Sequence, residues 1–134
     1  MKKNIINIKK INLKVILNKG VNIHVLEKII PFDIKRIYFL TKFNKNKIRD
    51  GHCHKLLEQF YICIRGRIKI YIEGKNFKKI IILKGSDTGI YLKKLTWRSL
   101  KSLANNSILL VLASDVYKKT DYIRNYNEFK NKIS

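Results

Sequence analysis

Apolar and polar residues alternate along most of this chain with a period near two. The stretch IKRIYFLTKF (34–43) alternates clearly, FYICIRGRIKIYIEGKNFKKIIIL (60–83) divides into three such runs, and SILLVLAS (107–114) is almost wholly apolar. β-branched residues dominate these runs, and turn residues separate them at intervals of about 8–12 positions. The pattern predicts antiparallel strands from residue 4 to about 114. It favours an all-β sandwich or barrel of antiparallel strands, an architecture that includes the jelly roll.

Two turns can be placed within the three-strand stretch. The segment EGKN (73–76) is a hairpin signal, and we expect Gly74 to supply the positive φ that a tight turn needs. Arg65 and Gly66 give a weaker signal, for a second turn or for a bulge.

The period changes only after Ser114. Thr120 or Asp121 is a candidate N-cap, and apolar residues at helical spacing follow it, namely Tyr122, Ile123, Tyr126 and Phe129. We therefore expect a short C-terminal helix over about 120–132. Because no repeat, linker or low-complexity segment interrupts the chain, residues 1–134 are expected to form a single domain.

The composition is that of a globular protein, with 46% apolar residues, one Pro and six Gly among 134. The formal charge of +21 would suit a phosphate backbone. However, Lys outnumbers Arg 24 to 6, and Lys, Asn and Ile are all abundant, as in proteins of AT-rich genomes. Phosphate recognition favours Arg, and nucleic-acid binders carry surface aromatics that this pattern lacks. We expect no nucleic-acid partner, although such a charge would attract a small anionic ligand.

Targeting signals are not evident. No apolar run approaches the roughly 18 residues of a membrane span, and lysines interrupt the N-terminal segment where a signal peptide would be apolar. Cys53 and Cys63 are too few for a disulfide framework. The expected location is the cytoplasm, without a membrane partner.

Candidate chemistry is concentrated in RDGHCHKLLEQF (49–60). On a strand, His52 and His54 point to one face and Cys53 to the other. Cys53 would then have only His24 left as a base, so a cysteine nucleophile is disfavoured.

Three interpretations of the histidine pair stay open. In the first, His52, His54 and Glu58 bind a metal, because they approach the first cupin metal motif. Arg98, however, stands where a further histidine is usual, and a guanidinium cannot coordinate a cation. In the second, the two imidazoles carry protons near neutral pH beside an anion held by cations, for which the candidates are Arg36, Arg49 and Lys55. In the third, they are structural residues of a barrel wall.

Longer segments resemble a known family. IPFDIKRIYF, RDGHCHKLLEQFYICIRGRIKI, GIYLKKLTW and ILLVLASDVYKKTDYIRNYNEF are similar, in this order and spacing, to the dTDP-4-keto-6-deoxyhexose 3,4-ketoisomerases. These are cupin-fold enzymes that make precursors of 3-amino-3,6-dideoxyhexoses. The resemblance covers about residues 20–129.

The resemblance implies a cofactor-independent isomerase. Its substrate would be a dTDP-linked 4-keto-6-deoxyhexose, and it would need no metal. It would form a homodimer in which the two subunits exchange N-terminal strands. His52 and His54 correspond to the family's histidine pair, and pocket positions fall on Arg36, Tyr38 and Arg49. The chain departs from the family at Cys53, where Ala is usual, at Trp97-Arg98-Ser99, where Trp-His-Glu is usual, and at NKG (18–20), where DxRG is usual.

From this resemblance we predict a mechanism and a set of contacts. His52 and His54 share proton transfer between C3 and C4 through an enediol or enediolate, with His54 slightly favoured as the base. Tyr38, Tyr91 or a nearby cation would polarise O4, and Arg98 is a candidate for substrate binding. Trp97 and Gln59 are candidates for contacts with thymine. A metal-binding cupin and a non-catalytic sugar-nucleotide binder remain the alternatives.

Overall fold

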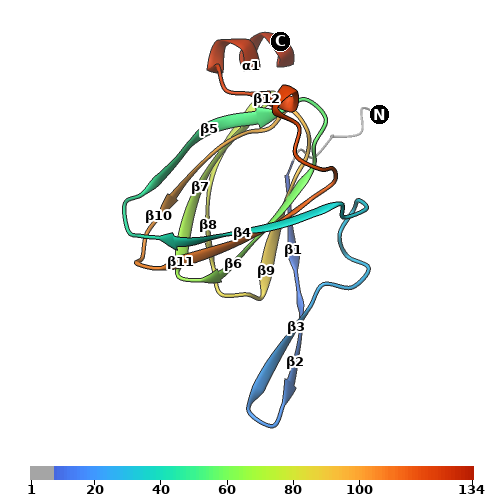
Figure 1. The fold of residues 1–134 in the computed structure, drawn as a ribbon, viewed down its shortest axis with the longest axis vertical. Coiled ribbons are helices and arrows are strands. Elements are labelled where there is room, and N and C mark those ends of the chain that lie inside the picture. Colours follow the sequence, from blue (N-terminus) through green and yellow to red (C-terminus); the bar gives the residue numbers. More distant parts are fainter. Residues whose placement is uncertain (1–7) are drawn as a thin grey trace.

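The computed structural model describes residues 8–134, which form two five-stranded antiparallel sheets packed face to face (Figure 1). The first sheet has the order β1 (Ile8–Asn12), β9 (Thr88–Leu92), β6 (Gln59–Arg65), β11 (Ser107–Ala113) and β4 (Arg36–Phe43). The second has the order β12 (Tyr122–Ile123), β5 (Ile48–His54), β10 (Trp97–Ser102), β7 (Arg67–Gly74) and β8 (Phe77–Lys84). The predicted all-β, jelly-roll-like class is confirmed.

A separate hairpin of β2 (Lys14–Asn18) and β3 (Val21–Val25) extends away from these sheets (Figure 1). It follows β1, which pairs with β9 of the same chain. The exchange of an N-terminal strand between subunits therefore stays a prediction. The start of the predicted strand region, residues 4–7, lies outside the described residues.

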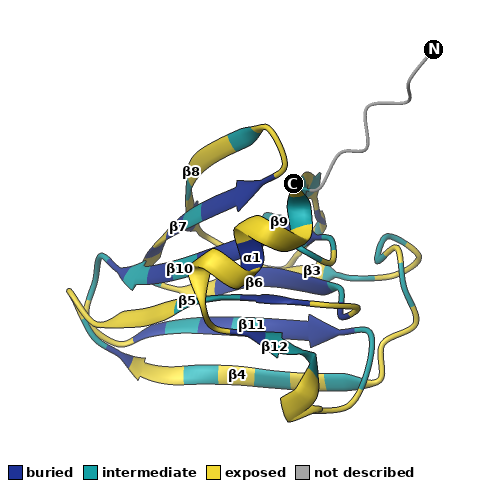
Figure 2. Ribbon diagram, turned by 90° about the horizontal axis from the view of Figure 1, so that it is seen from above, coloured by how far each residue is buried: buried dark blue, intermediate teal, exposed yellow. Residues whose placement is uncertain are grey.

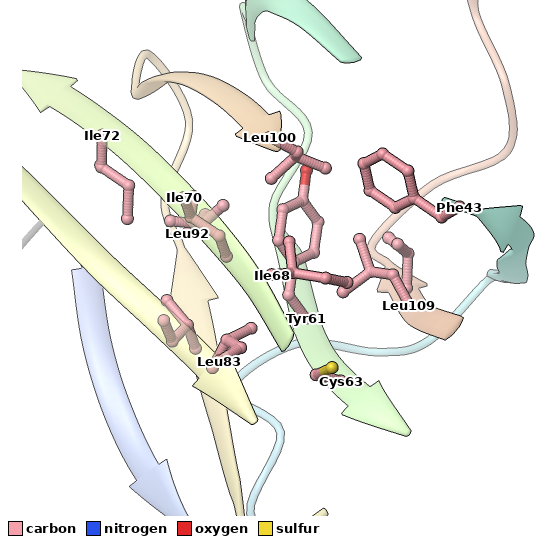
Figure 3. Close-up of a cluster of buried hydrophobic side chains, with 12 residues drawn as sticks. Phe43, Tyr61, Cys63, Ile68, Ile70, Ile72, Leu83, Leu92, Leu100 and Leu109 are labelled. Carbon is pink, nitrogen blue, oxygen red and sulfur yellow. The ribbon is translucent and has the colours of Figure 1, made fainter. Parts of the chain in front are cut away.

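The main core lies between the two sheets and is built by the alternation seen in the sequence. Ile68, Ile70 and Ile72 of β7 face inward, opposite Tyr61 and Cys63 of β6 (Figure 3). Leu83, Leu92, Leu100 and Leu109 join them from four further strands. This apolar packing holds the strands at fixed positions, on which any site between the sheets depends.

A second cluster covers the outer face of the first sheet. Phe60 and Ile62, which alternate with the inward residues of β6, pack there with Leu13 and Leu112 and with residues 26–32. Both faces of β6 are thus buried, as its dark colour in Figure 2 shows. This explains why the sequence of β6 is an almost continuous run of apolar residues.

The two predicted turns differ from expectation. β7 and β8 do form a hairpin around residues 73–76, but the residue with positive φ is Asn76 (66°) and not Gly74. Gly66 has a φ of 84° and joins β6 to β7, which lie in different sheets, so this turn is a corner between sheets and not a hairpin. A side chain at Gly66 would also collide with Ser107.

The predicted helix over 120–132 is wrong in its first half. Lys119–Asp121 form a 3₁₀ turn, Tyr122–Ile123 pair with β5 as β12, and α1 spans only Tyr126–Ile133. The N-cap is Asn125, whose side chain accepts a hydrogen bond from the Glu128 N–H (2.9 Å), so neither Thr120 nor Asp121 caps the helix. Backbone pairing with β5 explains the difference, because it holds Tyr122 and Ile123 extended.

α1 packs on the outer face of the second sheet, close to the end of β5 (Figure 2). Phe129 is fully buried there against Trp97, Cys53 and Ile123. Within residues 8–134, no helix is long and apolar enough to cross a membrane.

We expect Phe129→Ala to lower the free energy of unfolding by about 3–5 kcal/mol, because it removes a buried aromatic ring and leaves a cavity beneath α1. Chemical denaturation monitored by Trp97 fluorescence measures this. The control, Asn131→Ala, changes an exposed residue of the same helix and should alter stability by less than about 0.5 kcal/mol. Equal stability of the two variants would show that α1 contributes little to the fold.

Candidate active site

Polar side chains gather at one end of the space between the sheets. Arg36 and Tyr38 lie at the start of β4, Gln59 at the start of β6, Arg98 near the start of β10, and the two histidines at the end of β5. These strand ends meet because Ala113 pairs with both Arg36 and Gln59, and Arg98 pairs with His52. The opposite end of the same space is apolar, with Phe43 and Cys63 in the core.

His52 and His54 share a face of β5, as predicted. Their ring centroids are 5.0 Å apart and the rings are nearly perpendicular. The His52 Nδ1 lies 3.4 Å from the main-chain oxygen of Asp50. His54 is fully buried, and its Nδ1 lies 3.1 Å from Oδ2 of Asp121.

Asp121 and Tyr122 belong to this site although the sequence did not indicate it. Asp121 accepts hydrogen bonds from Leu56 N–H (2.9 Å) and contacts His54, while the Tyr122 ring lies 4.4 Å from the His54 ring and 5.4 Å from the His52 ring. Both residues fall in the segment predicted to be helical. The pairing of β12 with β5 brings them to the histidines, and no local pattern in the sequence encodes that pairing.

Arg98 is the largest fully buried side chain, with 0% exposure. Its Nη1 donates to Oε1 of Gln59 (3.3 Å), whereas its Nε and Nη2 have no hydrogen-bond partner among residues 8–134. A buried guanidinium with free donors is costly unless an acceptor meets it. An anionic or carbonyl oxygen that accepted from these two groups would offset this cost.

Gln59 is the centre of a small network. Its Oε1 accepts from Tyr61 (2.9 Å) and Arg98, which fixes the amide so that its Nε2 donates to the Tyr38 oxygen (3.2 Å). Because Tyr38 accepts this bond, its own hydroxyl hydrogen stays available for another partner. Burial raises the pKa of Tyr38, so the hydroxyl remains protonated near neutral pH. Gln59 is fully buried and bonds to three side chains of the protein, and its contact with thymine stays a prediction.

The histidines are neutral near pH 7. Burial, and next to it the positive charge of Arg98, lowers the pKa of His52 to about 3 and also lowers the pKa of His54. Asp121 would favour a charged His54, but burial and the guanidinium outweigh it. Both imidazoles can therefore accept a proton.

The remaining predicted cations lie around the pair. Arg36 stacks on the rings of Tyr38 (4.3 Å) and Tyr117 (5.3 Å). A bulge shifts the register between β5 and β10, so Arg49 pairs with Leu100 and lies on the same face of β5 as His52, although its side chain is exposed. Lys55 is exposed at the rim and donates to the main-chain oxygen of Thr120 (3.0 Å).

Two predicted site residues lie elsewhere. Trp97 is on the opposite face of β10 from Arg98 and packs against Phe129 with ring centroids 5.4 Å apart, so it is not brought to the histidines. Tyr91 packs on the outer face of the first sheet and donates its hydroxyl to Glu58. Trp97 therefore supports α1 rather than a nucleotide base, and Tyr91 does not reach O4 of a sugar at the pair.

The metal interpretation loses its third ligand. Glu58 is hydrogen-bonded to Tyr91 and does not join His52 and His54. Across residues 8–134, no three His, Cys, Asp or Glu side chains are grouped so that they could hold a metal ion.

Cys53 lies on the opposite face from the histidines, as predicted, and is completely buried under α1. Burial raises the pKa of its thiol to about 11, so the thiolate that a nucleophile requires is scarce at neutral pH.

A cavity of about 140 Å³ opens beside His54. Its wall combines charged and aromatic side chains from β4, the 114–118 loop, the 3₁₀ turn and β12, among them Arg36, Tyr117, Lys118, Asp121 and Tyr122. His54 is the one residue of the histidine pair that lines this cavity, and Arg98 does not line it.

Comparisons with known proteins show which proteins this chain is similar to. The model of the family described as FdtA: WxcM-like, C-terminal matches residues 1–134. The TDP-4-oxo-6-deoxy-alpha-D-glucose-3,4-oxoisomerase of Aneurinibacillus thermoaerophilus is 35% identical over 94% of this chain and 92% of its own length.

Solved structures give the same result. QdtA, a sugar 3,4-ketoisomerase from Thermoanaerobacterium thermosaccharolyticum solved in complex with TDP, is 40% identical, with a TM-score of 0.90 and 96% of each chain covered. A mutant of QdtA has been solved in complex with TDP-4-keto-6-deoxyglucose. The rmlC epimerase of Mycobacterium tuberculosis is 13% identical over 92% of this chain and 70% of its own, and its TM-score of 0.78 shows a shared fold only.

The lowered pKa of His52 predicts that stability falls in acid. The unfolded chain binds a proton near pH 6.5, whereas the folded chain does so only near pH 3. The free energy of unfolding should be constant above about pH 6.5 and decline as the pH falls toward 3, by about 2 kcal/mol at pH 5 for this group. Denaturation at pH 7 and pH 5 measures it.

Replacement of His52 by Asn should reduce this loss, because Asn does not titrate. The control is Asn131→Ala, which changes an exposed residue that does not titrate and should leave the pH dependence as it is in the wild type. Identical losses in all three proteins would contradict the neutral, buried state of His52.

Proposed function

We propose that this chain, which belongs to the family FdtA: WxcM-like, C-terminal, is a 3,4-ketoisomerase that converts TDP-4-keto-6-deoxyglucose into the 3-keto sugar. The observation that carries the proposal is a pair of neutral histidines beside a buried guanidinium with free donors. Such a site combines a base with a stabiliser of negative charge, which is what proton abstraction next to a carbonyl requires.

The reaction is an internal redistribution of hydrogen. The C4 carbonyl acidifies the C3–H bond, and a histidine Nε2 removes that proton to give an enediolate across C3 and C4. O4 then gains the proton that the C3 hydroxyl loses, and a proton returns to carbon at C4. Atoms and charge balance without an external oxidant or reductant, so the chemistry itself requires no cofactor.

Each side chain has a role that its geometry supports. His52 and His54 carry the carbon-bound proton, and His54 is favoured as the base because Asp121 holds its ring at a shorter distance than the Asp50 carbonyl holds His52. Arg98 donates to the oxygen that becomes negative. Tyr38, whose hydroxyl hydrogen is free, exchanges a proton with O3 or O4.

The diphosphate requires cations at the mouth of the site. Arg36, Arg49 and Lys55 are our candidates, and the stacking of Arg36 between two tyrosine rings restrains its guanidinium for such a contact. The aromatic group at the rim offers Tyr117 and Tyr122 as surfaces for the base in place of Trp97.

We also propose a cytoplasmic homodimer. The β2–β3 hairpin extends from the sheets and exposes apolar side chains, with Leu17 77% and Val21 61% exposed, which is unusual for a surface without a partner. Light scattering should give the mass of two chains, and a single-chain mass would contradict the dimer.

Both cysteines are unpaired, which suits a reducing compartment such as the cytoplasm.

The activity can be tested with TDP-4-keto-6-deoxyglucose in D2O, with the sugar protons followed by NMR. We expect loss of the C3 proton signal and appearance of the 3-keto product. His52→Asn and His54→Asn should each lower the rate by about 100-fold or more, because each removes an acid–base group from the pair. Asn131→Ala, which changes an exposed residue of α1, is the control.

Other outcomes identify the alternatives. Thermal stabilisation by TDP without any C3 exchange would indicate a non-catalytic binder of sugar nucleotides. Activity that chelators abolish and a divalent metal restores would indicate a metal-dependent cupin. Wild-type rates in both histidine variants would move the chemistry to other residues.

A further inference from the structure

Asp121 is the one carboxylate side chain within hydrogen-bond distance of either histidine among residues 8–134. It lies 67 positions along the chain from His54, in the segment that joins the last strand of the first sheet to β12. We propose that Asp121 is a positioning residue, which fixes His54 in the Nδ1–H tautomer and thereby directs the Nε2 lone pair toward the substrate.

The carboxylate is itself held in one orientation. The Leu56 N–H donates to Oδ1 (2.9 Å), and the Leu57 N–H donates to Oδ2 at a longer distance (3.4 Å). The main chain around it is tied to the same turn, because the Lys55 N–H donates to the Asp121 carbonyl oxygen (2.9 Å). Asp121 therefore receives donors from the protein on both of its oxygens, and it can only accept from His54.

The Asp121 carboxylate determines which ring nitrogen of His54 carries the hydrogen. A neutral histidine has one N–H and one lone pair, and the nitrogen that faces a carboxylate carries the hydrogen. His54 Nδ1 faces Asp121, so Nε2 has the lone pair. Nε2 is buried and has no hydrogen-bond partner among the described residues, as a base that awaits a substrate proton would be.

Replacement of Asp121 by Asn should reverse this tautomer. The shorter Leu56 bond retains the amide oxygen at the Oδ1 position, which places the amide NH₂ at the Oδ2 position facing His54. Nδ1 must then accept, and the ring hydrogen moves to Nε2. In catalytic triads, an Asp-to-Asn change of this kind costs about 10⁴-fold in kcat because the histidine adopts the wrong tautomer.

The inference rests on the proposed function for its kinetic part, so the experiment includes a readout that does not. The chain has only three histidines, so ¹⁵N NMR of their rings can be assigned with single His→Asn variants. In the wild type we expect a protonated Nδ1 and an unprotonated Nε2 at His54. In Asp121→Asn we expect the reverse, whereas Asp33→Asn, which removes an exposed carboxylate, should leave the spectrum unchanged.

Kinetics then test the consequence. We expect Asp121→Asn to lower kcat on the order of 10³-fold with a much smaller change in KM. In a His54→Asn background the same substitution should have no further effect on kcat, because Asp121 acts through His54. An additional loss in that background would indicate damage to the fold and would overturn the proposal.

The remaining outcomes are equally decisive. An unchanged His54 tautomer in Asp121→Asn, or an Nε2–H tautomer in the wild type, overturns the positioning role. A reversed tautomer with wild-type kcat overturns its catalytic consequence. If the wild type shows no ketoisomerase activity but the tautomer reverses as expected, the proposed function fails and the structural part of this inference stands.

Discussion

A buried guanidinium without a carboxylate partner determines the chemistry of this barrel. Arg98 is fully removed from solvent, and its one hydrogen bond within the described chain goes to the neutral amide of Gln59. Burying a cation in this way costs free energy that an ion pair would offset. Burial first, and this uncompensated charge after it, lowers the pKa of both histidines. In the proposed reaction the same guanidinium would also meet the developing negative charge.

Strand alternation lets β5 and β10 serve two purposes at once. Their inward residues, His52, His54 and Arg98, form the site, while Cys53 and Trp97 on the other face pack under α1. α1 follows β12 directly, and the pairing of β12 with β5 brings Asp121 and Tyr122 to the histidines. The apolar packing beneath the helix therefore supports the position of a polar residue on the opposite side of the same sheet.

How much of the fold and of the site the sequence could predict depends on how far apart along the chain the interacting residues are. The shared face of His52 and His54, and the opposite face for Cys53, depend only on the two-residue period of one strand. The position of Arg49 on the same face as His52 depends on a bulge, and the outward positions of Trp97 and Tyr91 depend on which face of their strands meets the core. The place of Asp121 in the site depends on a contact with a residue 67 positions away in the sequence. The segment around Asp121 was predicted to be helical because its apolar residues, which have helical spacing, also fit a short strand followed by α1.

The opposing charges around His54 fit a base that gains strength only when its substrate is present. With the site empty of negative charge other than Asp121, Arg98 and burial keep the imidazole neutral. In the proposed mechanism, the enediolate that forms when C3 loses its proton carries a negative charge that Arg98 can meet, and this charge offsets the repulsion between the guanidinium and the new imidazolium. Asp121, on the Nδ1 side, would stabilise the same imidazolium. In that mechanism the imidazolium keeps its proton while the enediolate exists and gives it up as C4 is protonated, when the compensating charge disappears.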